Sequence, residues 1–210
     1  MGITFCKIME QQKTLKEIAD ELMKIKGNVR GEVMRVDASF IREKEGEEGI
    51  SVVEKKMEEL GYPFTFEDIK PLSWYPEAQS VLVIIVAKES FDWTESDIFE
   101  LGDYAPKISF LSKMFIKYFV SLERILKESP KYWKTHFDFG ELEPAEINEK
   151  EKRVVIRIKG YKFHPIICAY HAAYFLRIIK SSVRGKNHSV EEIKCSHKGD
   201  SYHEYLMKWE

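Results

Sequence analysis

Apolar residues in the first part of the chain recur at intervals of three and four, the spacing of one face of an α-helix. Thr14 and Glu17 form a capping-box pattern at the start of one such series. Another series fills residues 47–61 and ends in a glycine, a common residue just past a helix end. Residues 27–37 instead alternate valine with polar residues, which predicts a short strand or an extended arm.

Two longer apolar stretches follow. Residues 77–91 are apolar on all sides, so they form a buried strand or a buried helix, and their length and acidic first turn favour the helix. Residues 107–128 carry large apolar side chains three and four positions apart and predict the longest helix of the chain. Such a stripe usually packs into a core, but one so rich in Phe and Met can also line a ligand cavity.

The pattern changes in the second half of the chain. Residues 135–161 contain two extended runs around a charged loop, and residues 164–180 predict a helix with Pro165 in its first turn. Residues 190–209 read as two strands around a Gly-Asp turn, the pattern of a hairpin. We therefore expect an α+β fold with a helical N-terminal half, strand pairs packed on a central helix, and a C-terminal β-hairpin.

The domain organisation expected from this pattern is simple. An N-terminal helix or arm occupies residues 1–26, and a single domain occupies residues 27–210. A chain of 210 residues is long enough to bury one large core.

Composition narrows the function classes. The net charge of −2 is nearly balanced, which argues against a nucleic-acid-binding surface. The longest apolar run, residues 81–87, is far shorter than the roughly 18 residues that span a bilayer, and the first residues lack a secretory apolar region. The three cysteines are an odd number in a chain without an export signal, which favours metal-binding or core roles over disulfides and a cytoplasmic location.

A possible metal site lies near the end of the chain. Glu192, Cys195 and His203 are close in sequence, and a helix packed beneath the hairpin could add Cys168. Two thiolates, an imidazole and a carboxylate suit a closed, structural zinc site, and the thiolates favour zinc over magnesium or calcium. The plainer alternative is that Cys168 is a small core residue and His203 an exposed one.

Strand geometry complicates this ligand set. Glu192 and Cys195 are three positions apart, so a regular strand would turn them to opposite faces. Glu192 must then lie before the strand or at a bulge. The alternative ligands are Glu191, which shares a face with Cys195, and two histidines, His171 and His197.

The stretches "HPIICAYHAAYFLRII" and "VEEIKCSHKGDSYHEYLMKW" resemble the C-terminal half of the 4-vinyl-reductase type domain, over about residues 160–209. That domain occurs in phenol-sensing bacterial activators, in a bacteriochlorophyll-synthesis protein and in archaeal stand-alone proteins. Its wider superfamily includes haem nitric-oxide sensors and vesicle-tethering subunits. The positions that match in order and spacing are Cys168, Glu192, Cys195 and the Gly199-Asp200 turn. The last ligand is a cysteine in the phenol sensors and His203 here, a change that keeps zinc chemistry possible.

The resemblance implies a sensory domain with a structural zinc that binds a small aromatic or lipid-like effector. It implies no enzyme, and the sequence contains no nucleophile elbow, Walker loop or dinucleotide-binding fingerprint. We expect no direct contact with nucleic acid or membrane, a homodimer, and a signalling partner or a separate effector domain. The candidate ligand-binding residues are Phe115, Phe119, Leu122, Trp133 and His136, with Ile147 on a floor strand.

Three alternatives remain open at this stage. A haem gas sensor needs an axial histidine on a helix that faces a large cavity, and "YFVSLER" at 118–124 is a poor match to the Tyr-x-Ser-x-Arg signature of that group. A vinyl reductase needs a nicotinamide or flavin site, of which the sequence gives no sign. A protein-interaction module without a ligand is expected if the Phe-rich stripe is packed solid.

Overall fold

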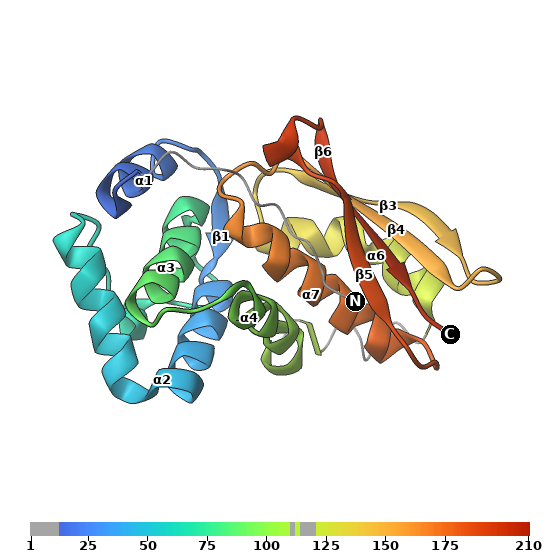
Figure 1. Ribbon diagram of the computed structural model, residues 1–210, viewed down its shortest axis with the longest axis horizontal. Coiled ribbons are helices and arrows are strands. Elements are labelled where there is room, and N and C mark those ends of the chain that lie inside the picture. The colour runs from blue at the N-terminus through green and yellow to red at the C-terminus, as the bar shows by residue number, and fades with distance from the viewer. Residues whose placement is uncertain (1–12, 110–111, 114–120) are drawn as a thin grey trace.

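The computed structural model describes residues 13–109, 112–113 and 121–210. Their helices are α1 (Leu15–Leu22), α2 (Gly31–Glu59), α3 (Glu77–Ser90), α4 (Glu95–Ile108), α6 (Leu122–His136) and α7 (Ile166–Ser182), with two short 3-10 helices, η1 (Phe66–Asp68) and η2 (Ser196–Lys198). Their strands are β1 (Asn28–Arg30), β2 (Trp74–Pro76), β3 (Glu141–Asn148), β4 (Arg153–Lys159), β5 (Ser189–Lys194) and β6 (Tyr202–Lys208). The expected α+β class, with a helical first half and a C-terminal hairpin, is confirmed (Figure 1).

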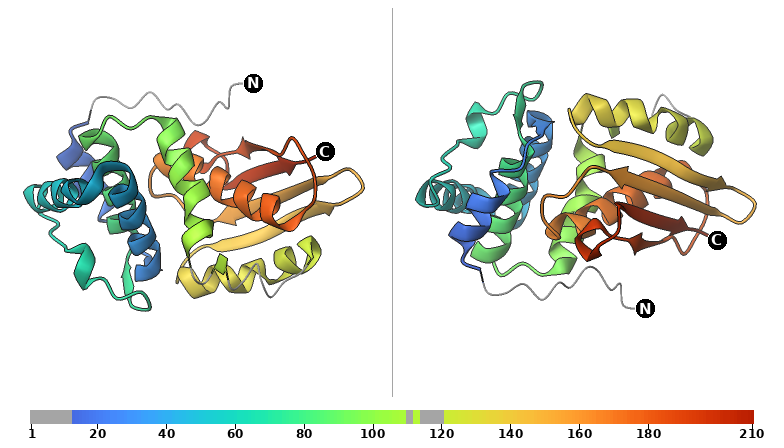
Figure 2. Two further views of the ribbon diagram at one scale, coloured as in Figure 1. Left: turned by 90° about the horizontal axis from the view of Figure 1, so that it is seen from below. Right: turned by 90° about the horizontal axis from the view of Figure 1, so that it is seen from above.

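The two halves of the molecule are a helical part and a sheet part. Strands β3 to β6 form one antiparallel sheet in the order β3-β4-β6-β5, and helices α6 and α7 pack against it. Helices α1 to α3 lie on the other side with the small β1-β2 ribbon, and α4 stands between the two parts (Figure 2). The chain thus has a seam between α2–α3 and α6–α7, where a site can be built from both halves.

Helix α3 is the central helix of the helical part. Its residues from Ala78 to Ala87 are buried on nearly every side, apart from a partly exposed Gln79. An all-round apolar surface of this kind marks a helix enclosed by other elements, and α1 and α2 pack on it. The sequence-based preference for a helix here is confirmed.

The prediction of a strand or arm over residues 27–37 is wrong for most of that segment. Only Asn28–Arg30 form a strand, and α2 begins at Gly31. Val29 lies in the strand, but Val33 is already helical, and buried Met34, Ala38 and Ile41 continue the helical spacing. The predicted helix at 47–61 is therefore the second part of α2, which bends at Gly46, where φ is 74°.

The single long helix predicted over 107–128 is also wrong. Helix α4 ends at Ile108, because Ser109 leaves the helical conformation. Helix α6 begins at Leu122, where the Ser121 side chain accepts a hydrogen bond from the amide of Arg124 and caps the helix. The spacing of large apolar residues continues across both serines, so periodicity alone did not show the helix ends at Ser109 and Ser121. Leu111, Phe115 and Phe119 of the predicted stripe lie outside the described residues.

Helices α4 and α7 touch backbone to backbone. A Cβ atom placed on Gly102 of α4 would lie 2.2 Å from the carbonyl oxygen of Tyr170 in α7. Any larger residue at position 102 would have to push the helices apart. This close approach places α7 between the sheet and α4. It also fixes the position of α7, which supplies residues to both sites described below.

The hairpin and the helix before it agree with the sequence. The helix predicted at 164–180 is α7, and β5 pairs with β6 in antiparallel register. The register shifts between Glu192 and Lys194, which is the bulge that a metal role for Glu192 requires. No helix among the described residues combines the length and apolar character needed to cross a bilayer.

Candidate metal centre and ligand cavity

Four predicted metal ligands meet where α7 passes beneath the hairpin. Cys168 lies in the first turn of α7, Glu192 and Cys195 lie at the end of β5, and His203 lies on β6. One ligand atom from each of these residues lies within 4.8 Å of the other three. The bulge after Glu192 lets its carboxylate and the Cys195 thiol face the same side, although they are three positions apart.

The separations in this cluster suit a tetrahedral metal. The Cys168 Sγ atom lies 3.8 Å from Cys195 Sγ and 3.8 Å from His203 Nδ1. In a tetrahedral site with Zn–S bonds of about 2.3 Å, two sulfur ligands lie about 3.8 Å apart. His203 Nδ1 is also 3.0 Å from Glu192 Oε1. The sulfur atoms are therefore at the spacing of a metal site and far beyond that of a disulfide.

His203 is held in the orientation that a metal ligand needs. Its Nε2 atom lies 3.0 Å from the backbone carbonyl oxygen of Tyr161 and 2.6 Å from the hydroxyl of Ser196. A carbonyl oxygen only accepts hydrogen bonds, so this contact favours the proton on Nε2 and leaves the Nδ1 lone pair facing the cluster. An outer hydrogen bond of this kind is the usual support of a metal-bound imidazole.

Hydrogen bonds within the Cys195 loop fix its conformation. The backbone amide of Cys195 donates to Asp200 Oδ2 over 2.8 Å, and its carbonyl accepts from the amides of Lys198 and Asp200. The turn continues through Gly199 at a φ of 101°. The Gly-Asp pair seen in the sequence thus folds the loop around the thiol.

The buried acidic groups of the cluster also favour the binding of a cation. A hydrogen bond with Cys195 and burial raise the pKa of the Cys168 thiol well above its ordinary value, because thiolates beside Glu192 would repel one another. Burial acts to raise the pKa of Glu192, but hydrogen bonds with His203 and Cys168 outweigh it and lower that pKa. Glu192 Oε2 is buried without a hydrogen-bond partner among the described residues. A divalent metal would satisfy this oxygen and lower both thiol pKa values.

The alternative ligands lie outside the group. Glu191 is exposed, on the other side of β5. His171 faces a different site further along α7, and the His197 ring centroid lies 5.3 Å from that of His203 without its nitrogens joining the cluster. The four residues first chosen from the sequence are the ones that the fold brings together.

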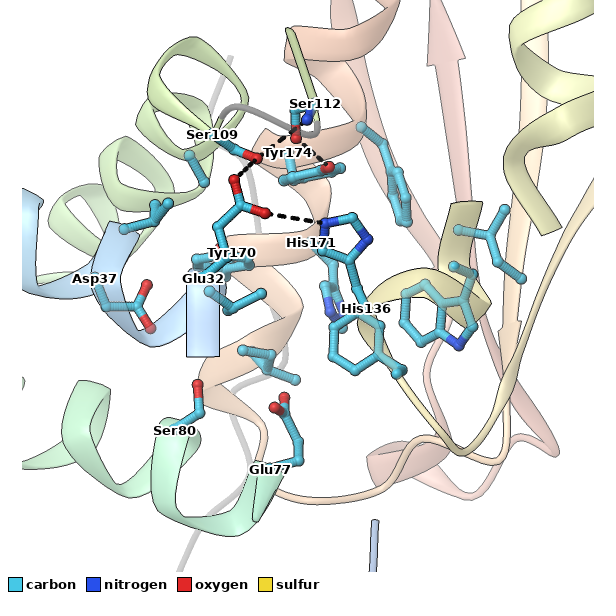
Figure 3. Close-up of a pocket in the computed structure, with 18 of the residues that line it drawn as sticks. Glu32, Asp37, Glu77, Ser80, Ser109, Ser112, His136, Tyr170, His171 and Tyr174 are labelled. Atoms are coloured by element: carbon cyan, nitrogen blue, oxygen red, sulfur yellow. Dashed lines mark hydrogen bonds and ion pairs between the residues drawn. The ribbon is translucent and has the colours of Figure 1, made fainter. Parts of the chain in front are cut away.

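A cavity of about 70 Å³ lies at the seam between the two halves (Figure 3). Its lining comes from α2, α3, α4, α6, α7 and β3 and from the segments that follow α4 and α6. Trp133 and His136 line it, as the sequence analysis expected, and so does the start of α7. Leu122 is buried elsewhere, and Ile147 on β3 is partly exposed and does not reach the cavity. The expected volume of a few hundred Å³ is wrong, and large aromatic side chains are prominent in the lining of the smaller cavity.

Local contacts hold His136 and Glu32 in the cavity. His136 Nδ1 lies 3.2 Å from the carbonyl oxygen of Tyr132, and its Nε2 is 3.9 Å from a carboxylate oxygen of Glu32. Burial lowers the pKa of His136, so its imidazole is neutral at pH 7. Glu32 also accepts a hydrogen bond of 3.0 Å from Ser109, the residue that ends α4.

Two further acids in the cavity were not found from the sequence. Asp37 of α2 and Glu77 of α3 are almost completely buried. Burial raises the pKa of Asp37 to about 8, although the Ser80 hydroxyl counteracts part of this rise. Burial likewise raises the pKa of Glu77 to about 8, although a hydrogen bond from the Tyr161 hydroxyl opposes it. Shifts of this size in a cavity mark candidate functional groups. The only sequence signal was an acid at an otherwise apolar helix position.

No protein-family model matches the sequence, and no curated protein matches it. Solved structures do share the fold. An H-NOX protein from S. oneidensis in the Fe(II)NO state superposes with a TM-score of 0.65 at 8% identity, over 86% of this chain and 99% of that one. An oxygen-binding H-NOX domain related to soluble guanylate cyclases gives 0.52 at 17% identity, over 84% and 92%. Identities this low show a common fold and nothing more about the ligand.

Haem does not fit the cavity of this protein. A volume of about 70 Å³ is far below the roughly 300–1,000 Å³ of cavities that hold drug-sized ligands. Ser121, which the sequence analysis compared with the serine of the haem signature, instead caps α6. His136 and His171 line the cavity together with Trp133, Tyr170 and Phe175.

Proposed function

We propose that this protein is a sensory domain that binds a small molecule in the seam cavity and holds a structural zinc ion under its hairpin. The observation that carries the ligand role is the cavity itself, which is enclosed by both halves and lined by buried polar groups in an apolar surround. That arrangement is typical of small-molecule sites. The likeness to H-NOX proteins supports a small ligand, because the structures that share the fold include one in an Fe(II)NO state and one described as an oxygen-binding domain.

The metal has a structural role in this proposal. Cys168, Glu192, Cys195 and His203 supply four ligands, so no coordination position is left for a substrate. When bound, zinc would tie the start of α7 to the hairpin. Because α7 also contributes Tyr170, His171 and Tyr174 to the cavity, the metal would hold one wall of the ligand site in place.

The effector in this proposal is small and is not a lipid. A single water molecule needs about 10–15 Å³ of cavity volume, so the seam accepts only a few heavy atoms. The protein acts without catalysis, and its response passes to a partner protein or to another domain. A haem gas sensor is the less favoured alternative, since the seam lacks the space for a macrocycle.

Three measurements test the proposal. Elemental analysis of freshly purified protein should find about one zinc per chain, and protein without a stoichiometric metal would remove the metal role. A thermal-shift screen of small amines, alcohols and phenols should find compounds that raise the melting temperature, because a ligand that binds only the folded state must stabilise it. An absorption spectrum without a Soret band after purification from haem-supplemented cells is expected as well.

A further inference from the structure

Of the four residue types Asp, Glu, Lys and Arg in the part of the chain that the structure describes, only the acidic ones line the seam cavity. Glu32 and Asp37 come from α2 and Glu77 comes from α3, while no lysine or arginine is among the described residues of the lining. Figure 3 shows the carboxyl groups of Asp37 and Glu77 directed toward the same space from their two helices. The cavity is therefore unsuited to an anion.

Several buried acceptors in this cavity lack a partner. Among the described residues, Oε2 of Glu77 has no hydrogen-bond partner, and the two oxygens of Asp37 make no hydrogen bond of full geometry, although the Ser80 hydroxyl is close enough to lower the Asp37 pKa. The Nδ1 atom of His171, a separate group on α7, is also buried and unpartnered. Buried polar groups in native proteins are almost always hydrogen-bonded, so atoms of this kind in a cavity indicate an absent hydrogen-bond partner.

We propose that the seam cavity binds a small organic cation of the alkylammonium class, whose N–H groups donate to Asp37 and Glu77. The inference rests on the proposed function, because it narrows the ligand of the same cavity. A primary ammonium group offers three donors and one positive charge, which matches acceptors spread around a space. The short alkyl part would pack against Trp133, Tyr170 and Phe175, and aromatic faces also attract cations.

Other ligand classes fit the cavity less well. A phenol, the effector suggested by sequence resemblance, donates one hydrogen bond and would leave most of these acceptors unpaired. A metal ion needs donor atoms that converge on one point. Among the described residues, only the cluster around Cys168 brings such atoms together, and the cavity acids do not.

Ligand binding should release a proton. Burial holds Asp37 and Glu77 at pKa values near 8, so both are mostly protonated at pH 7. An ammonium ion that arrives with its own charge favours one ionised carboxylate, and the displaced proton leaves to solvent. The other titratable groups around these acids are Glu32 on α2, Tyr132 and His136 on α6, Tyr161 after β4, and Tyr170, His171 and Tyr174 on α7.

The sign of the pH dependence follows from this release. Below about pH 8 a carboxyl must lose its proton for the cation to bind, so affinity should rise by about tenfold per pH unit as the pH increases. Above that pH the affinity should level off. The histidines do not reverse this trend, because burial lowers the pKa of His136 and brings that of His171 to about 3.

Calorimetry with methylammonium and ethylammonium tests the inference. Titrations in two buffers of different ionisation enthalpy should show about one proton released per ligand at pH 7. Tetramethylammonium carries the charge without N–H donors, ethanol has the size without the charge, and phenol tests the aromatic alternative. All three should bind at least about tenfold more weakly than ethylammonium, because each leaves the buried acceptors unpaired.

Two isosteric variants test the named residues. Asp37→Asn and Glu77→Gln should each weaken ethylammonium binding by more than about tenfold, and the two changes together should abolish the proton release. Glu48→Gln, an exposed position on the same helix as Asp37, should leave both unchanged. Circular dichroism establishes that each variant is folded.

The results of these experiments distinguish failure of the cation assignment from failure of the proposed function. Binding of phenol or ethanol in preference to the amines would overturn the cation assignment and leave a small-molecule sensor. Binding of none of these probes by the wild-type protein would overturn both. Amine binding without proton release, or with affinity that falls as the pH rises, would show that Asp37 and Glu77 do not hold the ligand.

Discussion

The metal cluster and the seam cavity both bury carboxyl groups with unpartnered oxygens, yet they are built differently. In the metal cluster one donor atom from each of four residues lies within 4.8 Å of the others, and two of the donors are sulfur. In the cavity the acids Asp37 and Glu77 stand on separate helices around an open volume. Convergent soft donors suit a single metal ion, whereas dispersed oxygen acceptors suit a molecular cation with several N–H groups.

The largest effect should come from opening the metal cluster. Cys195→Ser should lose the metal and lower the melting temperature by about 10 °C, since each 1 kcal/mol lost lowers it by about 2–4 °C in a chain of this size. Differential scanning fluorimetry measures the change. A chelator should lower the melting temperature of the wild type to a similar extent and leave the variant unchanged; equal responses of the two proteins to the chelator would contradict a metal role.

The next effect compares two neighbouring carboxylates. Glu192→Gln should weaken zinc binding by at least about tenfold, because it removes a charged ligand. Glu191→Gln, one residue away on the exposed side of β5, should bind zinc like the wild type. Competition with a colorimetric zinc chelator gives both affinities. Similar losses in the two variants would mean that bulk charge, rather than coordination, attracts the metal.

The cavity acids should be visible in the pH dependence of stability. The Glu77 pKa is about 8 in the folded protein against an ordinary 4.5, so its contribution is fully present below pH 4.5 and is lost as the pH rises toward 8. Glu77→Gln should remove this loss. Between pH 5 and 8 its free energy of unfolding should gain on the wild type by on the order of 3 kcal/mol. Urea titrations across this range measure the difference, and parallel curves would exclude a buried, protonated Glu77.

The smallest effect should come from the residue that contacts both regions. The Tyr161 hydroxyl donates to Glu77, while its backbone carbonyl faces His203 Nε2. Tyr161→Phe should cost about 1–2 kcal/mol and raise the Glu77 pKa further. It should leave the zinc content unchanged, because the carbonyl remains. Loss of metal in this variant would show that the side chain, and not the backbone, supports the metal cluster.

The clustering of the four candidate metal ligands could be predicted from the sequence because three of them lie within 12 residues on one hairpin. The hairpin alone brings these three residues close together, and only the approach of Cys168 had to be inferred from the tertiary packing of a helix against the hairpin. The bulge that resolves the facing problem at Glu192 follows from strand alternation. By contrast, Asp37 and Glu77 are 40 positions apart and meet His171 only through packing, so no local pattern relates them.

The errors in the predicted helices have a similar origin. Apolar periodicity indicates which residues are buried but not where a helix ends. The apolar spacing over residues 107–128 therefore gave no sign of the helix ends at Ser109 and Ser121. A serine inside an apolar repeat is the available signal for a helix end. At residues 27–37 the valine alternation was too short to outweigh the helical spacing that continues from Met34.

The backbone contact between Gly102 and Tyr170 limits how this protein can move. With no side chain between them, α4 and α7 have no layer of rotamers that could slide or repack, so they should shift together as one rigid body. A displacement that changes the cavity must then occur where side chains separate the helices, between α2–α3 and α7. Gly102, which allows α4 and α7 to meet, thus determines how occupancy of the cavity can reach the molecular surface: through a movement of α2 and α3 relative to α7.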